Sequence, residues 1–276
     1  MRKEPSTSTL VPARDVRIRI LGAFAIWSDG AFTHLPAPAQ RLAALLAMRG
    51  EPTARGIAAG TLWPEVDHDH ALANLRTALW RLRRASPGLV QLTQAHLHLD
   101  ALAAVDLHRS RSLAERILRS ELPMREAHGS AVDLSADLLP DLDDEWLVFE
   151  RERFRDLRIH ALERLSEQLS AIGEHADAVQ CGLLAVEGEP LRESAHRALM
   201  RAYIAEENRA SALQQFQVLE RRLDSELQVG PSIATMELAL ELRTACEARA
   251  LGEGRAPSVL EQVPRLQHPG RYPGGR

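Results

Sequence analysis

The hydrophobic pattern at the start of the chain is that of β-strands. After residues 1–14, a Ser/Thr/Pro-rich stretch that we expect to be disordered, apolar and arginine side chains alternate from Val16 to Ile20. Residues 24–27 resume this alternation before a turn at residues 28–30. Because alternation at a period of two residues buries one face and exposes the other, we expect a small antiparallel sheet here.

Three segments with helical spacing follow. Leucines predict a buried helix over residues 39–49. A shorter helix is expected over residues 55–62, ending before Pro64 because proline cannot continue a helix. An acidic loop over residues 65–70 then leads into a third helix over residues 71–85. Four leucines of this third helix form one narrow apolar stripe: Leu72, Leu75, Leu79 and Leu82.

A β-hairpin is predicted next. Two short apolar runs, residues 89–92 and 97–99, are separated by a polar tip at residues 93–96. Strands, three helices and a hairpin, in this order, are the pattern of a winged helix, in which the third helix enters the major groove of DNA. We expect this domain to span residues 15–110.

The face of the third helix opposite its leucines carries side chains suited to nucleic acid. Residues 71–85 contain no acidic residue, and a helix of this length, about 20 Å, fits the major groove of B-DNA. Asparagine and arginine can hydrogen-bond base edges, and further arginines can bind phosphates. The candidate contacts are Asn74, Thr77, Trp80, Arg81 and Arg84, with Arg76 and Arg83 on the flanks.

These candidates also have structural interpretations. An arginine-rich helix taken alone is more often a solvated surface helix, and only its place inside a winged helix favours DNA. Trp80 is either a base or sugar contact or a residue packed against the wing. Arg76 and Arg83 are alternatively partners of acidic residues in the same domain, and Trp63 has the size and position of a core residue.

The second half of the chain is almost wholly helical in pattern. A helix opens at residues 105–107, and Pro- and Gly-containing sequence follows, so we assign residues 111–140 to a linker with partial helix. Residues 141–250 should form a helical domain, and residues 251–276 a flexible tail. The long first helix of this helical domain, residues 141–172, is expected to pack through Trp146, Phe149, Phe154, Leu157, Leu162 and Leu165. Further helices are expected over residues 174–187, 191–206, 209–227 and 232–249.

One short pattern recurs in this helical half. Residues 173–178 and 208–213 each place a turn before small residues, at a spacing of 35 residues. A period of about 34 residues, with small residues where two helices pack closely, is typical of tetratricopeptide helix hairpins. The aromatic consensus is absent, so ordinary helix-bundle packing is the alternative. The predicted fold class is mainly α, a winged helix followed by a tetratricopeptide-like helical domain.

Charge is divided unequally between the two halves. The net charge is −4, but residues 1–100 carry 12 basic and 8 acidic residues, and the remainder carries 22 and 30. A basic part joined to an acidic part suits one domain for DNA and another for protein contacts. No apolar run reaches the length of a membrane span, and two cysteines do not make a disulfide framework. We therefore expect a cytoplasmic protein without a membrane partner.

Metal binding and catalysis have little support in the sequence. Residues 68–70, His-Asp-His, with His96 and His98 offer too few ligands for a metal site. Cys181 lies among apolar residues of a predicted helix and is expected to be inert. No nucleophile and base occur at a recognised spacing, so we predict no enzyme activity, no cofactor and no metal.

Several motifs combine into a family resemblance. In the first half they are residues 20–24 (ILGAF), 40–46 (QRLAALL), 62–64 (LWP) and the Leu-Arg-rich helix at 75–84. In the second half they are residues 144–146 (DEW), 150–153 (ERER), 190–196 (PLRESAH) and 226–227 (EL). In this order they resemble the bacterial transcriptional activators of the antibiotic-regulatory kind.

The resemblance implies a winged-helix DNA-binding domain and a bacterial transcriptional activation domain, with tandem binding to promoter direct repeats and recruitment of RNA polymerase. It assigns the polymerase contact to one loop and adds one DNA contact in the first helix. The loop candidates are Trp63, Glu65, Asp67 and His70, and the added DNA contact is Arg41.

The chain also departs from the family pattern. Ala39 stands where a basic residue is common, the usual Leu-Gly-Val-Glu-Pro is altered at residues 227–231, and the wing tip lacks Arg and Lys. No Gly-rich nucleotide-binding loop occurs, so the ATPase of larger relatives is not expected.

We therefore predict a sequence-specific regulator of transcription, an activator that binds double-stranded promoter DNA and RNA polymerase and self-associates through its helical domain. The alternatives are a repressor with the same DNA contacts and a tetratricopeptide-type scaffold whose winged helix docks proteins. Weak, salt-insensitive DNA binding would favour the scaffold.

Overall fold

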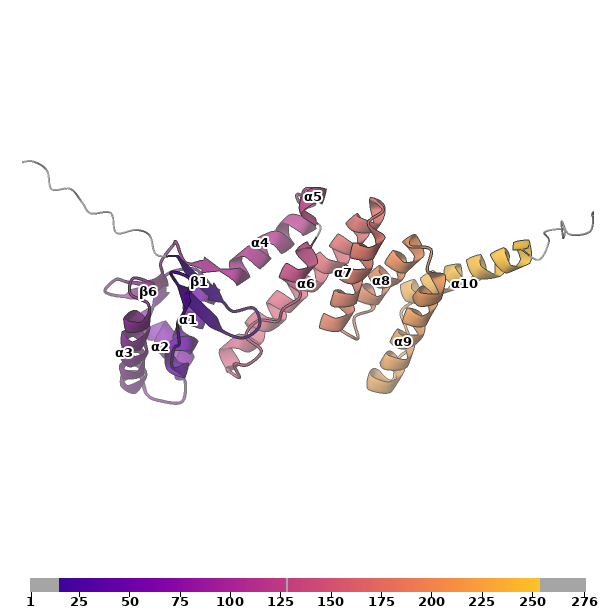
Figure 1. Cartoon of the computed structure of the whole chain (residues 1–276). Helices are drawn as coiled ribbons and strands as arrows, with labels where there is room; N and C mark the ends of the chain where they lie inside the picture. The colour runs from indigo at the N-terminus through magenta and orange to yellow at the C-terminus, as the bar shows by residue number, and fades with distance from the viewer. Residues whose placement is uncertain (1–14, 128, 254–276) are drawn as a thin grey trace, which may run out of the picture.

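The molecule is elongated, with a mixed α/β region at one end and a row of helices extending away from it (Figure 1). The computed structural model describes residues 15–127 and 129–253. The expected disordered N-terminus, residues 1–14, lies outside the described residues, and so does most of the expected tail. Within the described part of the chain, no helix is both long and apolar enough to cross a bilayer.

Two small sheets frame the N-terminal region. The first has the strand order β3-β2-β1-β7, with β1 antiparallel to β2 and parallel to β7, and the second has the order β4-β6-β5. The predicted N-terminal sheet and hairpin are confirmed. The bounds are β1 Val16–Arg19, β2 Ala25–Ser28, β3 Ala31–Phe32, β4 Thr53–Ala54, β5 Val90–Leu92, β6 His96–Leu99 and β7 Ala104–Val105.

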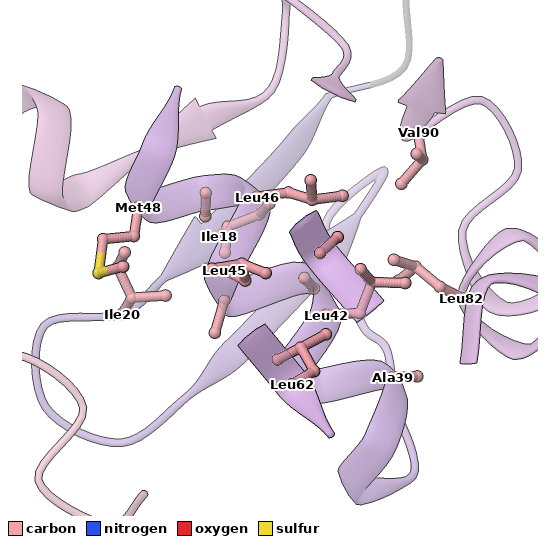
Figure 2. Close-up of a cluster of buried hydrophobic side chains, with 14 of the residues drawn as sticks. Ile18, Ile20, Ala39, Leu42, Leu45, Leu46, Met48, Leu62, Leu82 and Val90 are labelled. Carbon is pink, nitrogen blue, oxygen red and sulfur yellow. The ribbon is translucent and has the colours of Figure 1, made fainter. Parts of the chain in front are cut away.

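Three helices pack between and against these sheets: α1 Ala37–Arg49, α2 Arg55–Leu62 and α3 His68–Ala85. Helix α1 ends at Gly50, whose φ of 66° is left-handed and whose N–H donates to the carbonyl of Leu46. Figure 2 shows leucines of α1 surrounded by Ile18 of β1, Leu62 of α2 and Leu82 of α3. This is the mainly α fold with a winged-helix start that the sequence predicts.

Helix α3 begins three residues earlier than the sequence pattern suggested. The loop expected over residues 65–70 stops at Asp67, because the carboxylate of Asp67 accepts hydrogen bonds from the backbone N–H groups of Asp69 and His70. An aspartate in this position satisfies amide groups that have no partner inside the helix. The cap therefore adds a turn to the start of α3.

The second half stacks successive helices. Each long helix from α6 to α10 packs against the next along the chain, with tight turns between them. The Cα of Gly182 on α7 lies so close to α8 that an added Cβ would stand 2.9 Å from the Cα of Leu199. Small residues thus permit the close helix pairs of a tetratricopeptide-like stack. The bounds are α4 Asp106–Leu118, α5 Met124–Ala127, the 3-10 helix Ser130–Leu134, α6 Glu145–Ala171, α7 His175–Gly188, α8 Glu193–Ala205, α9 Arg209–Leu227 and α10 Ile233–Glu253.

Helix α6 begins later than the expected residue 141. Arg151 donates from Nε to the carbonyl of Leu138, at 2.9 Å, and from Nη2 to the carbonyls of Leu139 and Leu142. These bonds hold the preceding segment as a loop folded back on the helix, so the helix starts only at Glu145. At the other end, α10 continues to Glu253, beyond the expected start of the tail.

One side chain expected to pack α6 does not do so. Phe149 is 85% exposed, whereas Leu147 is fully buried. At 100° per residue, a side chain two positions after a buried one points to nearly the opposite face. The expectation for Phe149 was therefore wrong, and the core positions of α6 continue through Phe154, Leu162 and Leu165.

The segment between the halves is packed rather than loose. The carbonyl of Ile20 accepts from the N–H of Leu139 at 2.9 Å, and Leu138 and Leu139 are buried in the winged-helix core. Leu147 and Phe154 of α6 belong to this same core, while later residues of α6 pack with α4, α7 and α8. The limits assigned to the domains and linker stay a prediction, but one helix, α6, takes part in both cores.

Candidate nucleic-acid interface

Helix α3 is fixed by one buried face. Ala71, Leu75, Ala78 and Leu82 are buried against α1 and α2, and Leu79 is nearly so. Leu72, expected in the same stripe, is only half-buried. The other face of the helix is left for solvent.

That free face carries all the predicted contacts of the third helix. Thr77, Trp80 and Arg84 follow one another at i, i+3 and i+7, the spacing of a single stripe pointing away from the core. Residues 74 and 81 flank this stripe on one side, and residues 76 and 83 flank it on the other. The structure exposes every one of these side chains: Asn74, Arg76, Thr77, Trp80, Arg81, Arg83 and Arg84.

The arginines of α3 have no acidic partner. Among residues 15–127 and 129–253, no carboxylate forms an ion pair with Arg76, Arg81, Arg83 or Arg84. The alternative that Arg76 and Arg83 serve as internal ion-pair partners is thus not realised. Four cations on one exposed helix face create a positive surface that attracts phosphates.

A groove of about 480 Å³ runs beside this face, and arginines line it. Arg76, Arg83 and Arg84 of α3 face it together with Arg55 at the start of α2, and Leu92 of β5 closes it on the side of the wing. Sequence reasoning missed Arg55. A cation in the first turn of a helix opposes the helix dipole, and that unfavourable placement was the available signal.

Trp80 was expected either to be free for a DNA contact or to pack against the wing, and its side chain is partly exposed and partly in contact. It is 59% exposed, and the guanidinium carbon of Arg84 lies 5.4 Å from its ring centroid, a cation–π contact. It also lines the groove that Leu92 of the wing closes. The indole of Trp80 is therefore partly exposed, with the Arg84 guanidinium lying over its ring.

The wing presents a polar, uncharged tip. Strands β5 and β6 pair with Leu92 opposite Leu97, and the N–H of Thr93 donates to the carbonyl of His96 at 3.0 Å. The hydroxyl of Thr93 in turn accepts from the N–H of His96 at 2.9 Å. The tip is thus a tight, internally bonded turn that presents exposed polar side chains and no Arg or Lys.

Arg41 lies elsewhere and has another role. Its guanidinium pairs with Asp144, at the start of α6, and its Nη2 donates to the carbonyl of Leu62 at 2.7 Å. The side chains of Arg41 and Asp144 are only 24% and 12% exposed. The charge of Arg41 is thus engaged in joining α1, α2 and α6, an arrangement that disfavours the DNA contact expected for it.

The loop between α2 and α3 contains the four residues proposed to touch polymerase. Trp63 is half-buried and packs against the core, as its size predicts, whereas Glu65 is exposed. The hydrogen bond from the backbone N–H of His70 lowers the pKa of Asp67 below its ordinary value, and the hydrogen bond with the His70 ring lowers it further. Asp67 and His70 are thus tied together as the cap of α3, and Glu65 is the acid of this loop with a free side chain among the described residues.

The Cys181 thiol is free of any disulfide and buried. Burial raises the pKa of the Cys181 thiol to about 12, so the nucleophilic thiolate is scarce at neutral pH. In the part of the chain that the structure describes, no cluster of three or more His, Cys, Asp or Glu side chains is placed to hold a metal ion.

Known proteins of similar sequence are regulators. The chain is 31% identical over 247 residues to the regulatory protein AfsR of Streptomyces coelicolor and 26% identical over 245 residues to AfsR of Streptomyces griseus. Each alignment covers 85% of this chain but only 25% of the relative. The chain therefore spans about a quarter of the length of these curated relatives.

The fold and the family are also matched. A solved structure of Mycobacterium tuberculosis EmbR in complex with a low-affinity phosphopeptide has a TM-score of 0.65 at 16% identity, covering 91% of this chain and 74% of that one. This likeness concerns the fold. The family described as the bacterial transcriptional activator domain matches residues 105–243, half of the chain. The chain belongs to this family of transcriptional activators, which is a family of regulators rather than of enzymes.

Proposed function

We propose that this protein binds promoter DNA in a sequence-specific manner through α3 and activates transcription from it. The observation that carries the proposal is the exposed face of α3, which presents Asn74, Trp80 and four arginines that have no acidic partner among the described residues. Helix α3 is the last helix before the wing, the position of a recognition helix in a winged-helix domain.

The two flanks of α3 suit different parts of DNA. Asn74 and Arg81 lie together on the flank away from the groove, where paired hydrogen bonds to base edges are available to them. Arg76 and Arg83 line the groove with Arg55 and are placed to hold phosphates. In this arrangement base contacts specify the sequence, and phosphate contacts position the domain.

RNA polymerase is the proposed second partner. The loop between α2 and α3 is exposed at Glu65 and Val66, next to the helix that would contact DNA. The acidic helical domain is available for contacts with polymerase or with a second copy on an adjacent repeat. These roles follow from family membership, and a protein with them would act in the cytoplasm, where bacterial promoters lie.

The test is a titration of the full-length chain on promoter and random DNA across a range of salt concentrations. Each phosphate contact contributes a slope of about −0.9 in log affinity against log salt, so we expect a slope of several units. The double variant Arg81→Ala/Arg84→Ala should lose most of this affinity. Arg201→Gln, an exposed arginine of α8, is the matched control and should bind as the unmodified chain does.

A flat salt response, or equal binding by the double variant, would contradict the proposal and favour the scaffold alternative. Transcription in vitro from a bound promoter then separates an activator from a repressor. Addition of the unmodified chain should raise transcript yield, and a Glu65→Ala variant should bind DNA normally but raise the yield less.

A further inference from the structure

A second pocket lies where the winged-helix region meets the helical domain. This cleft of about 380 Å³ is formed by the end of α1, by β4 and α2 on one side, and by α4 and α6 on the other. Its volume lies within the range of pockets that hold small molecules. The cleft is separate from the arginine groove of α3, and no residue lines both.

Positive charge predominates in the cleft. Arg49 and Arg153 line it, and within the described residues neither forms an ion pair. Arg111 also lines it, but its Nη2 pairs with Glu150 at 3.1 Å and its Nη1 donates to the carbonyl of Met48 at 3.4 Å. Since Glu150 is neutralised by Arg111, the unmatched charges facing the cleft are two arginines and one acid, Glu51.

The cleft also offers hydrogen-bond donors. Trp146 lines it, and the indole Nε1 of Trp146 is buried without a hydrogen-bond partner among the described residues. This N–H is closed off from the cleft, so the Trp146 ring contributes a wall to the cleft rather than a donor. The hydroxyl-bearing side chains of Thr53 and Thr61 complete a polar lining.

We propose that this cleft binds a small organic anion through an oxyanion group, a phosphate or a carboxylate. Arg49 and Arg153 supply the charge for the oxyanion, and the hydroxyl of Thr61 is a hydrogen-bond donor on the opposite wall. Such charge-assisted bonds are the strong ones in anion recognition. Because the ligand would touch α1, β4, α2 and α6 at once, it would fasten the winged-helix region to the helical domain. The site does not depend on the proposed DNA contacts.

The test is the unfolding temperature of the full-length chain, measured against inorganic phosphate in one arm and citrate in the other, at constant ionic strength set with chloride. A ligand that binds the folded state raises this temperature in a saturable way. The apparent affinity should fall by about tenfold in Arg153→Gln and in Arg49→Gln, since each loses one charge-assisted bond. Arg201→Gln, which changes an exposed arginine outside the cleft, should not change it.

Two outcomes would overturn the site. One is the absence of a saturable rise with both anions. The other is an equal rise in an Arg49→Gln/Arg153→Gln double variant, which would place the anion elsewhere. The Arg81→Ala/Arg84→Ala variant must keep the full rise, because loss there would assign the anion to the α3 surface instead. A rise with phosphate alone or citrate alone supports the site and identifies the oxyanion.

Discussion

Helices α3 and α6 are both rich in arginine, yet they use it in opposite ways. On α6, Arg155 pairs with Glu152, Arg164 with Glu167 and Arg158 with Asp137, while Arg151 caps three carbonyls. On α3, the described part of the chain supplies no acidic partner to any arginine. Except at Arg153, which faces the cleft, arginine is thus a structural cross-link in α6, whereas in α3 it is a cation without an acidic partner among the described residues. The distribution of acids decides between the two.

Arg158 is the extreme case of the structural kind. Its side chain is 3% exposed, and burial lowers its pKa below the ordinary value even though Asp137 opposes that shift. Its Nη1 donates to the carbonyls of Leu134 and Ser135 at 3.3 and 3.1 Å. One guanidinium therefore holds the segment before α6 against the helix.

The largest effect should come from removing that guanidinium. Arg158→Ala leaves the carbonyls of Leu134 and Ser135 without this donor and opens a cavity, so it should destabilise the fold by about 2–4 kcal/mol. Arg164→Ala, which breaks an exposed pair, should cost less than about 1 kcal/mol. Urea unfolding of both variants measures the difference, and equal losses would show that burial does not separate the arginines of α6.

The next effect concerns binding rather than stability. Arg81→Ala should leave the unfolding free energy within about 0.5 kcal/mol of its original value, since surface substitutions usually do so. It should weaken binding to a specific promoter by about 1–3 kcal/mol while random DNA is bound nearly as before. A paired titration on both DNAs at one salt concentration tests this; a destabilised Arg81→Ala would place Arg81 among the structural arginines.

A smaller and different effect is expected for Arg83, on the flank that lines the groove. Arg83→Ala should weaken promoter and random DNA by the same factor and reduce the slope of log affinity against log salt by about 1. The measurement is the salt slope on both DNAs. If Arg83→Ala alone removed the discrimination between them, α3 would have to be rotated relative to the groove of DNA.

The smallest expected effect is a pH dependence of folding stability that arises in the helical domain, at His196, and not at the arginines of α3. His196 of α8 is fully buried, with its Nε2 3.0 Å from the carbonyl of Pro190 and its Nδ1 2.7 Å from the amide nitrogen of Gln215. Burial lowers its pKa below the ordinary value of 6.5, with Arg222 acting in the same direction and Pro190 and Glu193 opposing it. The unfolded chain thus binds this proton more readily than the folded chain.

It follows that the contribution of His196 to stability is complete above pH 6.5 and is lost as the pH falls from there toward the lowered pKa. Unfolding measured from about pH 7.5 to about pH 5.5 should show this loss, and His196→Gln should reduce it. The arginines of α3 stay protonated throughout, so their own contribution to the salt slope of DNA binding should not change over the same range. An identical pH profile in His196→Gln would exclude His196 as the cause.

Local patterns were sufficient to predict most elements. The alternation from Val16 predicted β1, leucine spacing predicted α1 and α3, and the absence of acids near Arg81 predicted an exposed cationic face. Each of these inferences depends on residues within a few turns of one another. The family resemblance, resting on several motifs in a fixed order, led to the mainly α fold and the activator family, both of which are confirmed.

Some differences, such as the exposed Phe149 and the earlier start of α3, had local causes, and the others came from contacts between residues apart in the sequence. Arg41 looks like a DNA-facing arginine until Asp144, far along the chain, is seen to pair with it. The start of α6 depends on which carbonyls Arg151 reaches, and the groove position of Arg55 depends on how α2 meets α3. No periodicity within one segment encodes such pairings.

The shared core of α6 has a consequence for how this protein can be divided in experiments. A fragment ending near residue 110 would strip Leu138, Leu139, Leu147 and Phe154 from the winged-helix core and leave their apolar partners in water. Newly exposed surface of this kind promotes aggregation. The smallest well-behaved DNA-binding piece should therefore extend past Phe154, and a protease should cut the intact chain between helices of the outer stack before it cuts within residues 120–140.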